Sequence, residues 1–370
     1  MPVSIGVQWP TLEEAVRCRR GDIRLVWCRT CGFIWNDRFD PGNLEYSQRY
    51  DNSLDFSPVF REFADGLAQR LINSYGIRGK KVIEIGCGKG YFLSLLCQKG
   101  DNHGLGFDPS YEGARMGDLE EDKITYIEDF YGEKYAQHRG DLVCCRHVLE
   151  HIVDPMSFLD TVRGTMKDTD SCAVYFEVPN VRFILEKFSI WDIIYEHCNY
   201  FSSESLGFIF EKCGFEVLGL EEAFGGQFLS IDAKPVPPAV RPAGSLRDLS
   251  ELGELVDAFA IAMKRLTAEW EGRLEAYRNA GQRVVLWGGG SKGVSFLNLL
   301  KNGNQVDYVV DINPYKQGRH IPGTGQKIVA PEELKGIAPD IVILMNPIYR
   351  GEVGGTMNGL GVSAEIVAVG

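Results

Sequence analysis

A glycine-rich turn between an apolar run and a helical pattern constrains the fold of this chain more than any other feature. Val82 to Ile85 is a short run rich in β-branched residues, which predicts a buried strand. The glycines that follow it directly are Gly86, Gly88 and Gly90. Apolar residues then recur at helical spacing from Phe92 to Leu96. This order predicts an α/β unit in which backbone N–H groups at a helix start face a ligand, because glycine lets the backbone approach closely.

Two carboxylates accompany this turn. Glu84 stands near the end of the strand, two residues before Gly86, and suits a cationic ligand better than a pyrophosphate. Tyr91 occupies the place where a dinucleotide-binding fingerprint has its third glycine. Asp108 ends the next predicted strand, 22 residues after Gly86, where an acid accepts hydrogen bonds from ribose hydroxyls. Asp108 by itself leaves S-adenosylmethionine and NAD open, whereas Glu84 and Tyr91 argue against NAD at this turn.

Polar residues follow the next two predicted strands. Asp129 and Phe130 come after the strand that starts at Ile124, where an acid and an aromatic ring suit the amino group and the face of an adenine. The alternative for Asp129 is a helix N-cap, and both interpretations stay open. His147 follows the strand that starts at Asp141 and is expected at the sheet edge, beside the cofactor.

The remaining polar residues near these strands divide into two groups. Glu150 and His151 follow His147 on a helical turn, and we expect them to be structural. Asn180 stands at the end of the strand that starts at Ser171, which is the ligand-facing end, and is a candidate substrate contact.

An aromatic segment over 191–202 carries the candidate chemistry. Tyr195, Glu196 and His197 are contiguous there. A histidine beside a carboxylate among aromatic residues can be tuned as a general base. The alternative is a packed, capped histidine that opens the helix predicted from Ser202. The cluster favours the catalytic interpretation of His197.

Length and composition bound the domain organisation. A chain of 370 residues is long enough for two or more domains. We expect an α/β protein with a cysteine-containing module over 1–45, a cofactor-binding doubly wound sheet over 46–235, a linker and long helix over 236–280, and a second Rossmann-like α/β domain over 281–370. A net charge of −12 without a basic run argues against duplex nucleic acid as a partner.

Targeting signals and cysteine usage indicate the compartment. No apolar run approaches ~20 residues, so no membrane span is expected. The ten cysteines have no regular spacing, which favours a reducing cytoplasm, and no signal-peptide pattern opens the chain. Cys28 and Cys31 form half of a tetrahedral zinc site, and Cys18 is the only other thiol nearby. We therefore expect two free thiols and no bound metal.

A second glycine turn opens the C-terminal domain. Gly288, Gly290 and Gly293 satisfy Gly-x-Gly-x-x-Gly, and Asp311 follows at the ribose distance. This pattern alone is compatible with a dinucleotide. It is equally compatible with the phosphates of a nucleotide-linked substrate, held by the residues Ser291, Lys292 and Lys316.

Together these motifs resemble the sugar C-methyltransferases of deoxysugar biosynthesis. The resemblance rests on "WCRTCGFIWN", "VIEIGCGKGYF", "RHVLEHIVDP", "FEVPN", "YEHCNYFS", "FGGQF", "GGGSKG" and "VDINPYKQGRHIPGT". It implies a class I methyltransferase domain that binds S-adenosylmethionine, with Glu84 at the amino-acid end of the cofactor and the glycines under its sugar. It also implies a nucleotide-linked keto-sugar as substrate, bound between the central and C-terminal domains.

The chain departs from the family pattern at two places. The first cysteine pair of the family's zinc module is absent. The family's catalytic stretch reads Tyr-x-Glu-His, so Ile194 takes the tyrosine position if the register follows Glu196 and His197. Tyr195 is then displaced, and Tyr50 matches a second family tyrosine at the mouth of the site.

These observations predict methyl transfer to carbon through an enolate. His197 takes a proton next to a ketone, Glu196 orients His197, and Tyr50 or Tyr195 donates a hydrogen bond to the enolate oxygen. The alternatives are O- or N-methylation of a small molecule, an NAD-dependent oxidoreductase that uses the turn at Gly288, and a cofactor-binding scaffold without chemistry. The oligomeric state is left open.

Overall fold

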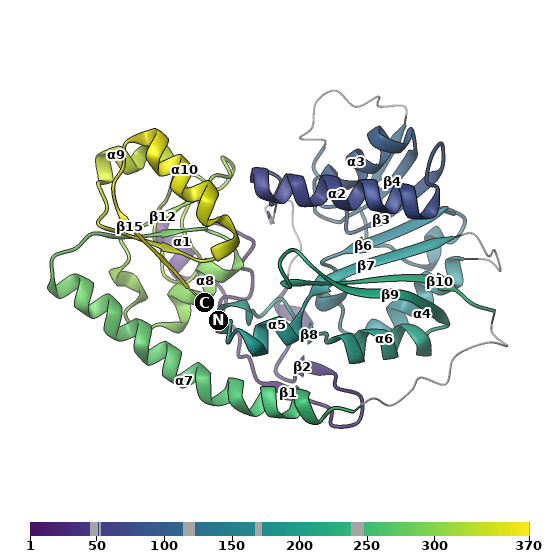
Figure 1. The fold of residues 1–370 in the computed structure, drawn as a ribbon, viewed down its shortest axis with the longest axis horizontal. Helices are drawn as coiled ribbons and strands as arrows, with labels where there is room; N and C mark the ends of the chain where they lie inside the picture. Colours follow the sequence, from purple (N-terminus) through teal and green to yellow (C-terminus); the bar gives the residue numbers. More distant parts are fainter. Residues whose placement is uncertain (45–50, 52, 114–122, 167–171, 238–247, 370) are drawn as a thin grey trace.

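The computed structural model describes residues 1–44, 51, 53–113, 123–166, 172–237 and 248–369. Two α/β units lie side by side, and a long helix runs beneath both of them (Figure 1). Among the described residues no helix is long and apolar enough to cross a bilayer.

The central unit contains a seven-stranded sheet with the order β5-β4-β3-β6-β7-β10-β9. Its strands are β3 (Lys81–Ile85), β4 (His103–Phe107), β5 (Ile124–Ile127), β6 (Leu142–Arg146), β7 (Ala173–Pro179), β9 (Phe215–Ala223) and β10 (Phe228–Pro235). All neighbours pair in parallel except β10, which is antiparallel to both β7 and β9. The predicted doubly wound sheet is confirmed.

Helices cover both faces of this sheet because alternate strand residues point to opposite sides. Val82 and Leu142 pack in one apolar cluster with α2 (Pro58–Tyr75) and α3 (Tyr91–Gly100). Ile83 packs in the other apolar cluster, together with residues of α4 (Pro155–Thr165) and α6 (Ser203–Lys212). The apolar residues of these strands therefore form a buried core on each face of the central sheet.

The C-terminal unit repeats the same architecture on a smaller scale. Its five parallel strands have the order β13-β12-β11-β14-β15. They are β11 (Val284–Trp287), β12 (Tyr308–Val310), β13 (Ile328–Val329), β14 (Ile341–Leu344) and β15 (Glu365–Ala368). The helices of this unit are α8 (Ser291–Leu299), α9 (Leu334–Ile337) and α10 (Arg350–Leu360). The second Rossmann-like domain is thus confirmed as an α/β unit.

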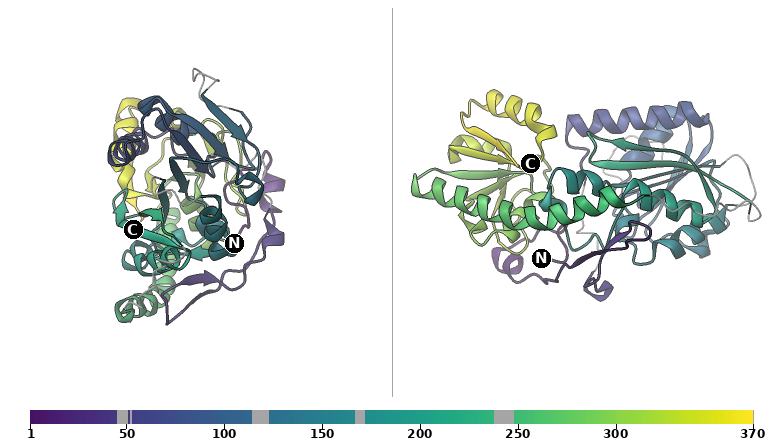
Figure 2. Two further views of the ribbon diagram at one scale, coloured as in Figure 1. Left: turned by 90° about the vertical axis from the view of Figure 1, so that its right-hand side faces the viewer. Right: turned by 60° about the horizontal axis from the view of Figure 1, so that its bottom comes forward.

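Helix α7 (Ser250–Asn279) joins the two units along their shared base, as the right-hand view of Figure 2 shows. Its Leu252, Phe259 and Trp270 are buried in one cluster with residues of α5 (Val181–Glu186) and of the C-terminal sheet. The apolar stripe of α7 therefore serves packing between the units.

The first 44 residues are divided between the two units. Trp9 exchanges backbone hydrogen bonds with His320 (3.1 and 2.8 Å), which attaches the segment before α1 (Leu12–Val16) to the C-terminal unit, while Ile5 and Gly6 donate to Glu196 of the central unit. Strands β1 (Leu25–Trp27) and β2 (Ile34–Asn36) instead form a small antiparallel sheet with β8 (Asn199–Tyr200). These residues do not pack as a separate module, because Ile5, Trp27 and Ile34 all join the apolar cluster that contains residues of α7 and of the C-terminal sheet.

Candidate active site

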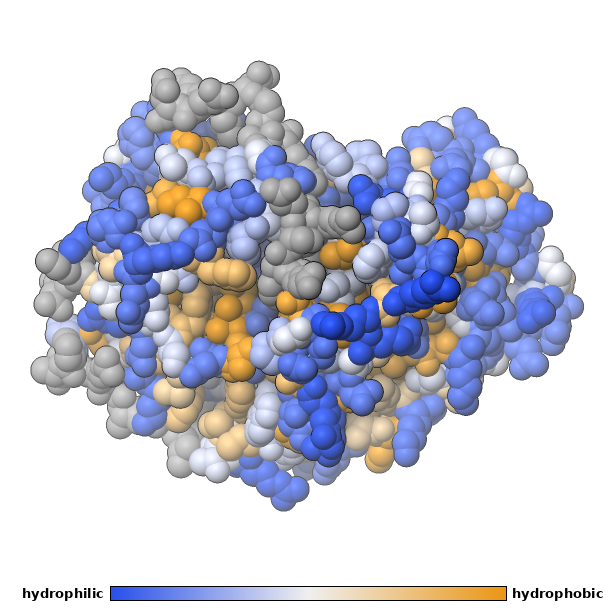
Figure 3. Space-filling view, turned by 180° about the vertical axis from the view of Figure 1, so that it is seen from behind, coloured by the Kyte–Doolittle hydropathy of each residue, from blue (hydrophilic) through white to orange (hydrophobic). Residues whose placement is uncertain are grey.

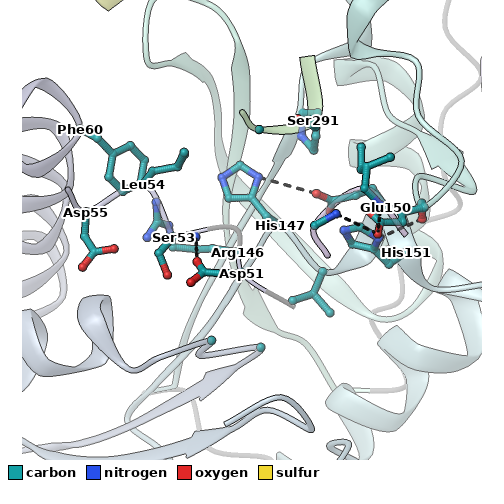
Figure 4. Close-up of a pocket in the computed structure, with 18 of the residues that line it drawn as sticks. Asp51, Ser53, Leu54, Asp55, Phe60, Arg146, His147, Glu150, His151 and Ser291 are labelled. Carbon is teal, nitrogen blue, oxygen red and sulfur yellow. Dashed lines mark hydrogen bonds and ion pairs between the residues drawn. The ribbon is translucent and has the colours of Figure 1, made fainter. Parts of the chain in front are cut away.

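A cavity of about 800 Å³ opens between the carboxyl edges of the two sheets. The ends of β3, β4 and β6, the segment 192–197, residues 5–8 and the turn before α8 contribute to its wall. Figure 4 shows His147 near the centre, Glu150 and His151 beside it, and Ser291 of the C-terminal unit across from them. Both glycine turns predicted from the sequence therefore face one shared space.

Glu84 is buried at the cavity wall. Its side chain is 3% exposed, and its Oε2 atom has no hydrogen-bond partner among the described residues. Burial raises the pKa of this carboxyl to about 7. A buried, unpartnered carboxylate oxygen is costly, and a cationic ligand group relieves that cost. The ammonium of S-adenosylmethionine fits this requirement.

The first glycine turn is braced by Asp108. The Gly88 N–H donates to Asp108 Oδ2 (2.8 Å), and the Ser110 N–H donates to Asp108 Oδ1 (2.7 Å). Gly86 and Gly88 have φ of 72° and 54°. A Cβ at Gly86 would lie 2.1 Å from Val148, whereas one at Gly88 would meet nothing within 4 Å. The open space at Gly88 leaves room for a ligand against the backbone.

Asp129 and Phe130 lie on the same wall. Asp129 accepts hydrogen bonds from Tyr135 (2.6 Å) and Lys134, and these hold its pKa below the usual value. Asp129 does not cap the helical turn that follows, since Gly132 has that position, so the N-cap alternative is wrong. Phe130 is 59% exposed and lines the cavity.

A buried charge cluster follows β6. The Arg146 Nε and Nη2 atoms donate to Glu177 Oε1 (3.0 and 2.9 Å). His147, whose φ is 55°, lies between two carboxylates, with Nε2 3.1 Å from Glu177 Oε1 and Nδ1 3.7 Å from Glu150 Oε1. Burial by itself lowers the pKa of His147, but the two carboxylates outweigh it and raise the value to about 9. His147 is therefore charged at neutral pH.

Glu150 and His151, expected to be structural, line the cavity. Together with His197 they form a group whose ligand atoms lie within 4.8 Å of one another. Burial lowers the pKa of His197 to about 3, so its imidazole is neutral. The sequence could have indicated that Glu150 and His151 line the site. They lie in the turn that follows β6, and the carboxyl end of β6 reaches the same sheet edge as Glu84.

The three contiguous residues predicted to be catalytic, Tyr195, Glu196 and His197, do not all face the cavity. Glu196 lines the cavity, but its Oε1 accepts backbone hydrogen bonds from Ile5 (2.9 Å) and Gly6 (3.4 Å), and burial raises its pKa to about 8. The Tyr195 hydroxyl accepts hydrogen bonds from the backbone of Asp40 and from Asn43, at 3.0 and 3.1 Å.

Tyr195 consequently points into the N-terminal segment, away from the cavity, so the structure does not support its assignment as a catalytic residue. Ile194 lines the cavity instead, which agrees with a displaced tyrosine. Tyr50, the second tyrosine predicted for the site, lies outside the described residues.

The C-terminal unit contributes Ser291, Lys292 and Lys316 to the wall. Lys292 Nζ lies 2.9 Å from Asp192 Oδ2 and 3.1 Å from Gln227 Oε1. Lys316 Nζ lies 3.7 Å from Asp311 Oδ2. Both lysines thus have a carboxylate partner within the protein.

Asn180 lies outside the cavity wall, contrary to its assignment as a substrate contact. Its Oδ1 accepts the Arg182 N–H (3.0 Å) and so caps helix α5. Its Nδ2 donates to Glu222 Oε1 (3.1 Å) and to the Gly226 carbonyl (2.9 Å). The side chain is fully used in joining α5 to the turn between β9 and β10.

Two places bring metal-ligand side chains together. Cys28 and Cys31 share the β1–β2 turn, and no third ligand side chain joins them in the part of the chain that the structure describes. Cys18 interacts with Arg20 and the backbone at Gly323 on the C-terminal unit. The zinc module implied by the family resemblance is therefore incomplete in the described residues. The second place is the group of Glu150, His151 and His197.

Sheet order, glycine turn and buried acid together define a class I methyltransferase fold with an appended α/β unit. Residues 59–220 match the family model of a methyltransferase domain, and residues 248–361 match that of a C-methyltransferase C-terminal domain. The chain is an S-adenosylmethionine-dependent methyltransferase. Its cofactor fits the turn at Gly88 and the unpartnered oxygen of Glu84.

The chain is similar to the C-methyltransferase NovU of Streptomyces niveus, with 28% identity over 290 residues, 74% of this chain and 68% of the relative. It is also similar to the ubiquinone biosynthesis O-methyltransferase of Cronobacter sakazakii, with 32% identity over 127 residues, 33% of this chain and 52% of that protein. The match thus spans about half the length of the O-methyltransferase.

Among solved structures, magnesium protoporphyrin IX methyltransferase from Synechocystis PCC 6803 with bound SAH matches 47% of this chain and 83% of its own length, at 14% identity and a TM-score of 0.37.

Proposed function

We propose that this enzyme methylates a carbon atom next to a carbonyl group of a small molecule, and that the acceptor is a nucleotide-linked keto-sugar. The observation that carries the proposal is a neutral, buried histidine, His197, on the wall of the cavity that also contains the cofactor turn. The C-terminal match to a C-methyltransferase domain agrees with transfer to carbon. The cofactor supplies an electrophilic methyl group on a sulfonium.

The protein has to make the carbon nucleophilic. A neutral imidazole accepts the proton of a C–H bond next to the ketone, and the bonding electrons move to the ketone oxygen as an enolate. The bound cofactor would supply the methyl group to the enolate carbon, and the S–CH₃ bond would break with its electrons left on the sulfur. His147, charged and in the same cavity, adds positive charge near the developing negative charge, while its two ring nitrogens face Glu177 and Glu150. Tyr50 remains the predicted donor to the enolate oxygen.

The acceptor class is supported by the C-terminal end of the cavity. Ser291 is the first residue of α8, and the free N–H groups at a helix start favour phosphate. Lys292 and Lys316 add positive charge, although each shares it with a carboxylate. We expect the diphosphate to contact mainly backbone N–H groups there.

A second candidate is O- or N-methylation, since the O-methyltransferase relatives share the cofactor domain. In that case His197 takes a proton from a hydroxyl or an amine. Product NMR separates the cases, because C–CH₃, O–CH₃ and N–CH₃ groups have distinct shifts and couplings.

The test of the proposed function is the variant His197→Asn. The methylation rate should fall by roughly 10²-fold or more, the usual scale for loss of a general base. Cofactor binding by calorimetry should be unchanged, because Glu84 and Asp108 lie elsewhere on the wall. Exchange of the acceptor's α-proton with deuterated solvent should also be lost.

The matched control is His103→Asn, which removes an exposed histidine at the start of β4. It should leave rate and exchange unchanged. Retained α-proton exchange in His197→Asn together with a lowered melting temperature would assign His197 a structural role and refute the proposal.

A further inference from the structure

Glu150 is a buried carboxylate at the centre of the histidine cluster. It lies in η3 (Leu149–His151), is 1% exposed, and neither of its oxygens has a hydrogen bond among the described residues. Its Oε1 atom is 3.7 Å from His147 Nδ1 and 4.0 Å from His197 Nε2. A carboxylate buried without hydrogen bonds is costly, and the rings of His147 and His197 lie within ion-pair distance of it.

Glu196, the sequence neighbour of His197, does not meet the His197 ring. Its carboxylate accepts the N–H groups of Ile5 and Gly6. Its backbone carbonyl accepts the His151 Nδ1–H (2.9 Å). Glu196 therefore fixes the N-terminal segment and the ring of His151, and the carboxylate within ion-pair distance of His197 is Glu150.

We propose that Glu150 is the positioning residue of His197: it holds the His197 proton on Nε2 and balances the charge of the ring when Nδ1 takes the acceptor proton. The Nδ1 atom has no hydrogen-bond partner among the described residues and therefore keeps its lone pair. Because almost none of its surface is accessible, the ring has to turn toward the acceptor in the loaded enzyme. This inference rests on the proposed function, in which His197 is the base.

The proton transfer balances without a further reagent. The acceptor C–H bond breaks, its proton goes to His197 Nδ1, and its electrons go to the enolate oxygen. The ring becomes an imidazolium whose Nε2–H faces the carboxylate. In the structure without ligands, His197 Nε2 lies 4.0 Å from Glu150 Oε1. We expect this distance to shorten to a hydrogen bond when the substrates bind, as is common for catalytic hydrogen bonds.

A divalent metal on Glu150, His151 and His197 is the competing interpretation, since the three ligand atoms are close enough. His147 argues against it. This ring lies 3.7 Å from the same carboxylate and already compensates its charge. A dication there would lie against an imidazolium and, in the loaded enzyme, near a sulfonium.

The experiment compares wild-type enzyme with Glu150→Gln, which keeps shape and removes charge. The probe is a nucleoside-diphosphate-linked keto-hexose in deuterated buffer with S-adenosylmethionine. Exchange and kcat should fall roughly 10-fold or more with little change in KM. Cofactor affinity should be unchanged, and Glu150→Asp should restore part of the rate.

The pH profile gives a readout that a packing role does not move. The acidic limb of kcat should shift upon loss of the carboxylate. The titratable groups that act on His197 besides Glu150 are His151 and His147.

The matched control is Asp232→Asn. Asp232 is a buried, ion-paired carboxylate that binds Arg70 (3.0 Å) and Tyr75 (2.8 Å), outside the cavity wall. Its loss should lower the melting temperature while exchange per folded molecule stays the same. A Glu150→Gln variant with this behaviour would overturn the inference.

Two further outcomes distinguish a failure of the proposed function from a failure of the role proposed for Glu150. If wild-type enzyme neither exchanges nor methylates the keto-hexose, the proposed acceptor chemistry fails. If wild-type enzyme is active only with one bound metal per chain, and Glu150→Gln loses that metal, Glu150 is a ligand and the positioning role is refuted.

A measurement without acceptor keeps the inference testable if Glu150→Gln does not fold. The ¹⁵N shifts of the His197 ring in wild-type protein report which nitrogen carries the proton, with His197→Asn as the assignment control. We expect the proton on Nε2. A proton on Nδ1 would contradict the inference directly.

Discussion

Burial and long-range partners, more than sequence neighbours, set the charge state of each acid and base in the cavity. Glu196 and His197 are adjacent, yet burial raises the pKa of the first to about 8 and lowers that of the second to about 3. Glu177 is equally buried, but Arg146 at 2.9 Å lowers its pKa to about 2. Burial therefore neutralises a group unless the fold supplies a partner.

The Oε2 atom of Glu84 has no hydrogen-bond partner among the described residues, and we predict that it binds the cofactor's ammonium. Glu84→Gln should weaken S-adenosylmethionine binding roughly 10- to 100-fold, the scale of a lost charged hydrogen bond. Asp108→Ala should also cause a large loss, because it releases the Gly88 turn. Calorimetry on the apoenzyme measures both.

The control for these variants is Asp101→Asn, an 82% exposed carboxylate paired with Lys123 outside the cavity. It should not change the dissociation constant. Unchanged affinity in both Glu84→Gln and Asp108→Ala would refute the location of the cofactor.

At the scale of elements, the same strand–turn–helix unit is used twice. In the first unit Asp108 accepts the Gly88 N–H at 2.8 Å, and in the second Asp311 accepts the Gly289 N–H at 2.8 Å. A Cβ at Gly293 would lie 2.1 Å from the Gly288 carbonyl, so this glycine serves helix packing. The Gly-x-Gly-x-x-Gly pattern in the C-terminal unit is thus explained by turn geometry and helix packing, without a bound dinucleotide.

We predict that the C-terminal turn binds no NAD of its own. Both turns open into one cavity of about 800 Å³, which has to hold methyl donor and acceptor together. Titration of the full chain, saturated with S-adenosylmethionine, with NAD or NADP should give no binding heat. Tight binding that Gly290→Val abolishes would contradict this prediction.

The β1–β2 turn leads to a prediction about metal content. Cys28 and Cys31 supply two of the four ligands of a tetrahedral site, so elemental analysis should find well under one zinc per chain. Cys28→Ser should not change the measured content. One tightly held zinc that this variant loses would require ligands beyond these two and would refute the prediction.

At the scale of the whole molecule, the two units close on the cavity through polar contacts. The Ser57 hydroxyl at the start of α2 donates to Glu352 of α10 (2.6 Å), and Lys292 pairs with Asp192 (2.9 Å). On the face seen in Figure 3, hydrophilic residues predominate and apolar residues form patches between them. The buried apolar residues of the described chain form four clusters.

Stability should depend on pH through several buried groups. Glu84, Glu196 and His147 have pKa values raised to about 7, 8 and 9, so the folded chain binds more protons than the unfolded one. Their contribution is full below the unfolded pKa values and is lost as pH rises through these folded values. Glu177 and His197, whose pKa values are lowered to about 2 and about 3, act oppositely: their contribution is lost as pH falls below the unfolded pKa values.

Urea melts of the apo chain should therefore show a maximum between about pH 4.5 and 6.5 and a decline towards pH 9. Glu196→Gln should flatten the decline, because glutamine keeps the acceptor for Ile5 and Gly6 without titrating. Stability that rises from pH 6 to 9 would contradict the assigned charge states.

Local sequence patterns were enough to predict both α/β units and the acids that follow their strands. Glu84, Asp108 and Asp311 are placed by local patterns, because a strand, a turn and a helix are each fixed by neighbouring residues. The displacement of Tyr195 by Ile194 was likewise foreseeable from the register of the motif.

Only the tertiary structure decided which side chains meet. Glu150 reaches His197 across 47 positions, and Ile5 reaches Glu196 across 191, so no local pattern reports these contacts. Asn180 has the right position at a strand end, but capping α5 uses its side chain. Packing places the carboxyl edges of two sheets against each other, and that juxtaposition creates both the cavity and the charge states within it.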